Sequence, residues 1–214
     1  MALELFEDEL LRQLRPEDAC ACGQPVTHLR EELLRMARAT EWGTVDAASF
    51  EGHVYEIEWL HEPAVPVAGI CLAALADDIA QPARDAFVDL LCGIAAATTT
   101  SIDVGGGRDL VAECEAIIRP GTWLLYAEIL SGRHARTAVL CFEILQELNE
   151  DVERLRALYR IAHSSLRGTS FWLEARNRSI LEQSADAPER RAGRERKPFQ
   201  RKTSLYCRRP GRSS

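Results

Sequence analysis

The sequence predicts an all-α fold: a right-handed α-solenoid of stacked antiparallel helix pairs, with a disordered basic C-terminal tail. Three observations lead to this prediction. Apolar residues recur at spacings of three and four along most of the first 170 residues. No segment shows clean two-residue alternation framed by turn signals, so we expect strands to play no important part. Helix pairs recur about every 30 to 45 residues, a period typical of helical solenoids.

Charge divides the chain into a body, residues 1–170, and a tail, residues 171–214. Of the 214 residues, 46% are apolar, enough to bury one sizeable core. Residues 174–214 hold 12 basic and 5 acidic side chains, whereas residues 1–173 hold 14 basic and 28 acidic ones. Proline and glycine interrupt the tail and its apolar residues lack a period, which predicts disorder. A misframed extension explains the same composition.

The predicted helices are separated by prolines, glycines and polar turns. Pro16 stops the first helix, Pro82 opens another in its first turn, and Asp151 can cap the last. On the helix that follows Pro82, we expect Arg84, Asp85 and Asp89 to face outward. The expected helices cover residues 1–15, 25–39, 50–60, 64–76, 82–94, 108–118, 122–130, 133–148 and 152–162.

One helix pair, residues 64–97, is the clearest repeating unit. A helix that is apolar nearly all round precedes an Asp-Asp turn, a proline and an arginine-led amphipathic helix. This order resembles a HEAT repeat, with a weaker echo at residues 135–155. The residues that carry the resemblance are Pro66, Val67 to Ala76, Asp77, Asp78, Ala83, Arg84, Leu90 and Leu91. Phe87 and Ile79 depart from the family pattern. The resemblance implies an α-solenoid that binds another macromolecule.

These observations predict a protein-interaction module. The candidate partner-binding residues lie before the repeat-like core: Trp42, Tyr55, Glu56, Glu58 and Trp59. Aromatic side chains anchor interfaces, and the glutamates favour a basic partner surface. A bacterial immunity protein that holds a basic toxin or nuclease is one concrete version, and a scaffold protein is another. The same aromatic residues could instead cap the end of the solenoid.

A metal-dependent enzyme is the alternative function. If residues 50–60 form a helix, His53 and His61 lie two turns apart on about the same side, near Glu56 and Glu58. An exposed acidic helix face explains these residues equally well. No Gly-x-Ser-x-Gly pattern predicts a nucleophile, and the glycines at 105–107 lack the Lys-Ser/Thr of a P-loop. We therefore expect no catalytic residue and no enzyme activity.

Three further side chains, Cys20, Cys22 and His28, are of the kinds that bind zinc. A closed site needs four ligands, and no second Cys-x-x-Cys or His-x-x-x-His pattern follows. We interpret the two cysteines as incidental thiols in a loop between helices, and expect neither a metal nor a cofactor.

Seven cysteines and an acidic start without an export signal favour a reduced, cytoplasmic protein. Four of the cysteines, at positions 71, 92, 114 and 141, lie in apolar helical runs and are expected to be buried. The uncharged stretch at 63–76 is too short to span a bilayer, so we expect no membrane partner. Phosphate contacts need basic residues, so the acidic body disfavours nucleic acid, while the tail allows weak non-specific contact.

Overall fold

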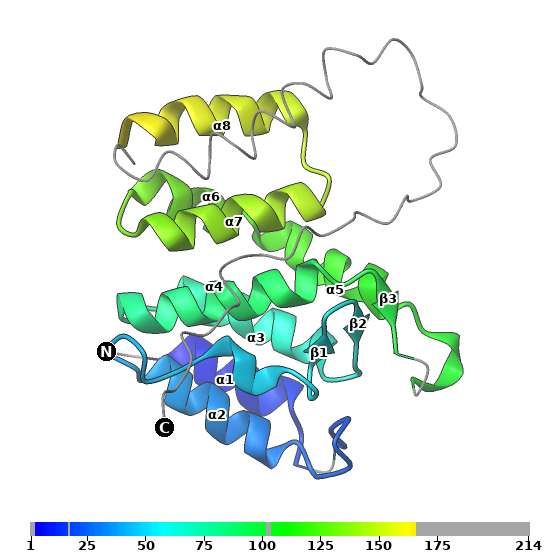
Figure 1. The fold of residues 1–214 in the computed structure, drawn as a ribbon. Helices are drawn as coiled ribbons and strands as arrows, with labels where there is room; N and C mark the ends of the chain where they lie inside the picture. The colour runs from blue at the N-terminus through cyan, green and yellow to red at the C-terminus, as the bar shows by residue number, and fades with distance from the viewer. Residues whose placement is uncertain (1–2, 17, 102–103, 166–214) are drawn as a thin grey trace, which may run out of the picture.

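The computed structural model describes residues 3–16, 18–101 and 104–165, and it is predominantly helical, as predicted. The predicted tail lies outside the described residues. Figure 1 shows the helices in successive layers, with α1 and α2 at one end, α3 and α4 in the middle, and α6, α7 and α8 at the other end. The α-helices are α1 (Glu4–Gln13), α2 (Thr27–Ala37), α3 (Ala64–Ala76), α4 (Gln81–Ala95), α5 (Leu110–Ile118), α6 (Thr122–Ser131), α7 (Ala135–Glu147) and α8 (Val152–Ser165).

One apolar core runs through these layers. Helix α3 packs against α1, α4 and α5, α4 packs against α7, and α6 packs against α7 and α8. Every one of these helices contributes buried apolar side chains to the same core. Along the described ranges, no helix combines the length and the apolar character that crossing a bilayer requires.

The central pair, α3 and α4, forms because its two sequences suit two different surroundings. The α3 sequence AVPVAGICLAALA is apolar all round, which matches its position between neighbouring helices. Pro82 lies in the first turn of α4, where its missing N–H has no helical partner to lose. Arg84 is buried and donates hydrogen bonds to the backbone oxygens of Leu75 (2.8 Å) and Asp77 (2.9 Å) at the end of α3.

The prediction that Arg84, Asp85 and Asp89 face outward is wrong for the first two, which are buried. Arg84 is buried where it pairs with Glu128 of α6, and Asp85 is buried because α7 packs against α4. Arg136 of α7 pairs with Asp85 and, at 2.7 Å, with Asp89. Thr137 donates to Asp85 at 2.8 Å. Burial is tolerated because these charges are paired and hydrogen-bonded.

The predicted helix at residues 50–60 is also wrong. A short 3-10 turn, η1 (Ala47–Phe50), is followed by two antiparallel strands, β1 (Tyr55–Glu56) and β2 (Trp59–Leu60). Strand β2 also pairs in parallel with β3 (Thr99–Thr100), so a small three-stranded sheet lies beside the helices. Gly52 adopts φ +79°, which ends η1, and the following β-branched and aromatic residues favour extended backbone.

Two further 3-10 turns, η2 (Gly105–Gly107) and η3 (Arg119–Gly121), flank α5. The predicted cap of the last helix is confirmed, because the Asp151 carboxylate accepts a hydrogen bond from the backbone N–H of Arg154 at 2.9 Å.

The six described cysteines are free thiols. Cys71, Cys114 and Cys141 are buried, as predicted, whereas Cys92 is only half-buried. Burial raises the pKa of the Cys71 and Cys141 thiols and raises that of Cys114 to about 12. These three thiols are therefore neutral packing groups near neutral pH.

Candidate functional site

The loop between α1 and α2 folds into a tight turn that carries two cysteines. The backbone N–H of Cys20 donates to the oxygen of Gln24 at 2.8 Å, and the N–H of Gly23 donates to the oxygen of Cys20 at 2.9 Å. Gly23 adopts φ +79°, a conformation that side chains rarely allow. Cys20 and Cys22 lie in this turn, separated by one residue, Ala21. Cys20 is buried and Cys22 is exposed.

His28 lies in the first turn of α2, and a backbone contact determines how its ring is oriented. Its Nδ1 lies 2.8 Å from the backbone oxygen of Pro25. A carbonyl oxygen can only accept a hydrogen bond, so this contact requires the proton on Nδ1. In the neutral ring the lone pair is then on Nε2, which lies 3.9 Å from the Cys22 Sγ.

His53 comes from a separate segment, between η1 and β1, and completes the group. Its Nδ1 lies 3.3 Å from the Cys20 Sγ and 3.4 Å from the His28 Nε2. The ligand atoms of Cys20, Cys22, His28 and His53 all lie within 4.8 Å of one another. We call these four residues the Cys/His cluster. Within the described residues, it is the one place where three or more metal-ligating side chains converge.

The Cys/His cluster is partly shielded from solvent: Cys20 is buried, His28 and His53 are half-buried, and Cys22 is exposed. Burial raises the pKa of the Cys20 thiol. Burial also lowers the pKa of His53, and the neighbouring rings of His28 and His61 lower it further. The Cys/His cluster brings two sulfur donors and two nitrogen donors together at one point.

The enzyme alternative relied on other neighbours of His53. His61 Nε2 lies 3.8 Å from Glu56 Oε1, but His61 is not part of the Cys/His cluster. Glu58 is exposed on the hairpin formed by β1 and β2. The structure thus groups the ligand atom of His53 with those of the two cysteines and His28, and His61 lies near His53 without joining this group.

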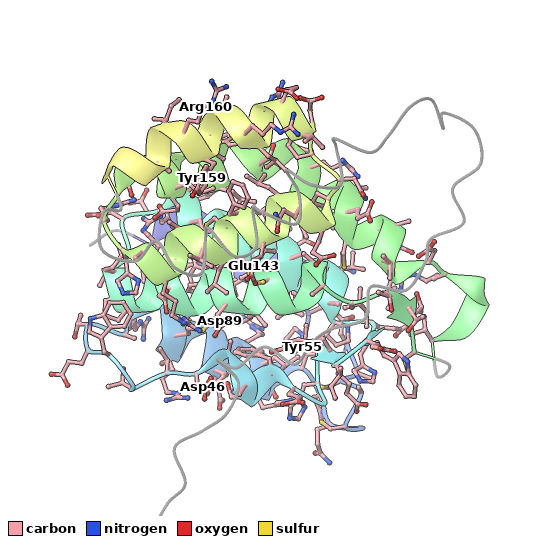
Figure 2. The ribbon with its side chains drawn as sticks, turned by 45° about the horizontal axis from the view of Figure 1, so that its top comes forward. Asp46, Tyr55, Asp89, Glu143, Tyr159 and Arg160 are labelled. Atoms are coloured by element: carbon pink, nitrogen blue, oxygen red, sulfur yellow. The ribbon has the colours of Figure 1, made fainter. Side chains whose placement is uncertain are left out.

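The partner-binding candidates do not form one surface. Tyr55 is half-buried, and a Cβ atom added to Gly93 of α4 would come within 2.7 Å of its ring. Its hydroxyl donates to the backbone oxygen of Ala47 at 3.5 Å. Figure 2 labels Tyr55 where the hairpin segment meets α4. These contacts make Tyr55 a packing residue.

Trp42 lies at a different place from Trp59. It stacks on His134, which caps the start of α7, with ring centroids 4.5 Å apart. Figure 1 places the turn between α6 and α7 on the left and β2, which contains Trp59, on the right.

Trp42 lines a pocket of about 140 Å³ together with acidic residues of two segments. Asp46 and Asp89, both labelled in Figure 2, contribute carboxylates, and Arg136 lies beside them. Burial raises the pKa of Asp89, and Arg136 opposes that rise.

Trp42 is 55% exposed, and the tip of the β1–β2 hairpin is exposed as well. Ile57 is 68% exposed and Trp59 is 47% exposed, while Glu56 and Glu58 are exposed beside them. Sequence reasoning named the tryptophan and both glutamates but not Ile57, because a helix would have turned that side chain inward.

No protein-family model, curated protein or solved structure matches this chain. Function is therefore inferred from the side chains of the chain itself and from their geometry.

Proposed function

We propose that this chain is a protein-interaction module, a HEAT-like α-solenoid that binds a macromolecular partner through the tip of the β1–β2 hairpin. The observation that carries this proposal is the exposure of Ile57 and Trp59 beside two exposed glutamates, Glu56 and Glu58. Large apolar side chains that are exposed to solvent as a group and surrounded by polar residues are typical of interaction sites. Tryptophan in particular contributes strongly to binding energy at interfaces.

Charge supports a basic partner. Residues 1–173 contain 28 acidic and 14 basic side chains, and both Glu56 and Glu58 project from the hairpin tip. Complementary charge speeds encounter and selects among partners. An immunity protein that holds a basic toxin or nuclease is the concrete form that we favour, and a scaffold protein has the same chemistry.

The α3–α4 pair supports the HEAT-like part of the proposal. Arg84 joins the end of α3 to α4 through two backbone oxygens, which gives the arginine of the repeat-like motif a physical role. At the weaker echo, Arg154 instead pairs with Glu150 at 3.3 Å on the exposed side of α8.

The test compares partner capture by the full chain and by two surface variants. Ile57→Ser/Trp59→Ser removes the apolar tip, and Trp123→Ser removes an even more exposed tryptophan on α6 (61% exposed) as a matched control. We expect the parent and the control to retain the same protein from source-cell lysate at about one copy per chain, and the hairpin variant to lose it. Circular dichroism verifies that each variant is folded. Absence of a retained protein, or its equal retention by the hairpin variant, would overturn the proposal.

Association kinetics test the charge component. Glu58→Lys reverses one charge at the hairpin tip, and Glu153→Lys reverses one on α8 at the other end of the molecule. We expect only the first variant to slow association with the captured partner at low salt, and the difference to shrink as salt is raised. Equal rates for the two variants at low salt would exclude steering by the hairpin glutamates.

A further inference from the structure

We infer that the Cys/His cluster, made of Cys20, Cys22, His28 and His53, is a four-ligand Zn²⁺ site with a structural role. This inference goes beyond the proposed interaction and does not rest on it. It depends on the distances between the four side chains, on the backbone that orients them and on the chemistry of their donor atoms.

Three of the distances between the four side chains are close to those of a tetrahedral zinc site, and all of the ligand atoms lie within 4.8 Å of one another. Zinc lies about 2.3 Å from a thiolate sulfur and about 2.0 to 2.1 Å from an imidazole nitrogen. In a tetrahedron, these bond lengths place two nitrogens about 3.3 Å apart and a sulfur and a nitrogen about 3.6 Å apart. The nitrogens of His28 and His53 lie 3.4 Å apart. The two sulfur–nitrogen distances are 3.3 Å, from Cys20 to His53, and 3.9 Å, from Cys22 to His28.

Backbone contacts orient the ligands from outside the site. The bond from His28 Nδ1 to the Pro25 oxygen points Nε2 at the cluster. Metal-binding histidines commonly bond a carbonyl or carboxylate through their other nitrogen, which sets the tautomer and the ring orientation. The turn at Gly23 shapes the loop in which the Sγ atoms of Cys20 and Cys22 lie within 4.8 Å of each other. A zinc ion would therefore find four ligands that need little rearrangement.

The donor set selects zinc over the other common divalent ions. Mg²⁺ and Ca²⁺ prefer oxygen ligands, and none of the four donors is an oxygen. Two thiolates and two neutral imidazoles balance the two positive charges of Zn²⁺. Four protein ligands also leave no open coordination position, which is the property of structural rather than catalytic zinc sites.

The role of the metal follows from where its ligands come from. Cys20 and Cys22 belong to the loop between α1 and α2, His28 to the start of α2, and His53 to the segment that leads into β1. One ion bound to all four would join the His53 segment to the other two at a point where the described residues show no strand pairing between them, since the nearby bridge, Ala19 with Pro25, lies within the cysteine loop. Zinc binding would therefore stabilise the N-terminal layer of the fold.

Metal analysis of the full chain tests the inference. The protein is purified with a thiol reductant, stripped with a chelator, and reconstituted with ZnCl₂ alone. We expect about one zinc per chain after removal of free metal, and a higher unfolding temperature than that of the stripped protein. Substitution with Co²⁺ should produce the visible absorption of a tetrahedral site together with a near-ultraviolet thiolate-to-cobalt band. Retention of copper or iron in preference to zinc would overturn the assignment.

Three variants separate the proposed ligands from their neighbours. Cys22→Ser and His28→Asn each remove a ligand at an exposed or half-exposed position, and His61→Asn removes a nearby histidine that is outside the cluster. We expect the first two to lose zinc to the chelator at least about tenfold more readily than the parent, and Cys22→Ser to weaken the thiolate-to-cobalt band. The His61→Asn variant should bind zinc like the parent.

Two further results would overturn the proposal. One is a stripped chain that takes up no zinc while folded, because the cluster would then be only a set of thiol–imidazole hydrogen bonds. The other is undiminished zinc affinity in both Cys22→Ser and His28→Asn, which would place any metal elsewhere. Neither result depends on whether the hairpin tip binds a protein, so this inference and the proposed function fail separately.

Discussion

The ion pair between Arg84 and Glu128 offers a direct test of what holds the helix layers together. The Nη1 of Arg84 lies 2.8 Å from the Glu128 Oε1, and the two side chains are 7% and 4% exposed. Arg84 also donates to the backbone oxygens of Leu75 and Asp77. Arg84→Met keeps most of the side-chain volume and removes every one of these donors.

The expected loss of stability comes from two sources. Removing one partner of a buried ion pair costs about 3 to 5 kcal/mol. Glu128 retains a second cation, Arg133 at 2.7 Å, so the lower figure applies to the Arg84→Met variant. The Leu75 oxygen is left without its donor, which adds about 1 kcal/mol or more, whereas the Asp77 oxygen keeps the N–H of Ile79 at 3.1 Å. We therefore expect a loss of about 4 kcal/mol in unfolding free energy.

The double variant Arg84→Met/Glu128→Leu provides the sharper comparison. Glu128→Leu alone leaves a buried guanidinium without its carboxylate and should cost about 3 to 5 kcal/mol. The double variant buries no charge, so its cost should fall short of the sum of the single costs by at least about 2 kcal/mol.

Urea unfolding followed by far-ultraviolet circular dichroism measures the unfolding free energy of the parent, the two single variants and the double variant. Arg133→Met is the control, because Arg133 is about half exposed and Arg84 remains on Glu128. It should cost less than about 1 kcal/mol. Additive costs in the double variant, or a loss below about 1 kcal/mol for Arg84→Met, would refute the reasoning.

Two further substitutions test burial and pH dependence. Leu91→Ala, at a fully buried position, should lower the unfolding free energy by about 2 to 5 kcal/mol. The control, Leu130→Ala at a position that is 46% exposed, should lower it by less than about 0.5 kcal/mol. Similar losses for the two variants in urea titrations would contradict the core assignment. Burial raises the pKa of Asp89, so the folded chain holds that proton more tightly than the unfolded chain, and the contribution of Asp89 to stability falls as pH rises. Asp89→Asn should therefore gain stability relative to the parent as the pH rises above about 4, where an ordinary aspartate loses its proton, in the same titrations, and a constant difference would disprove this.

The helices that could be predicted from the sequence are those with clear local signals. The apolar run of α3 begins and ends at the predicted residues, Ala64 and Ala76. Asp151 caps α8 as expected, because a side-chain cap depends only on neighbouring residues.

The hairpin was mispredicted because two patterns overlap there. Phe50, Val54 and Ile57 have the spacing of a helix face, while Gly52 and the β-branched residues favour a turn and strands. Two-residue strands are too short to show the alternation that identifies longer ones.

Burial of charge depends on partners distant in the chain, which spacing cannot reveal. Asp85 is buried because α7 lies over it, and its partner Arg136 is 51 positions away. The Cys/His cluster likewise depends on residues that are distant in the chain. His53 follows His28 by 25 positions, and the predicted helix had assigned it to a different site.

The pairing of β2 with β3 has a mechanical consequence for the molecule. The chain leaves β2 to form α3 and α4 and then returns to the same place as β3, where the Ser101 N–H donates to the Leu60 oxygen at 2.8 Å. The Thr100 hydroxyl in turn accepts the N–H of Leu110, in the first turn of α5, at 2.9 Å. A force applied to the hairpin therefore reaches α5 along a short line of hydrogen bonds, without first having to deform the apolar interior.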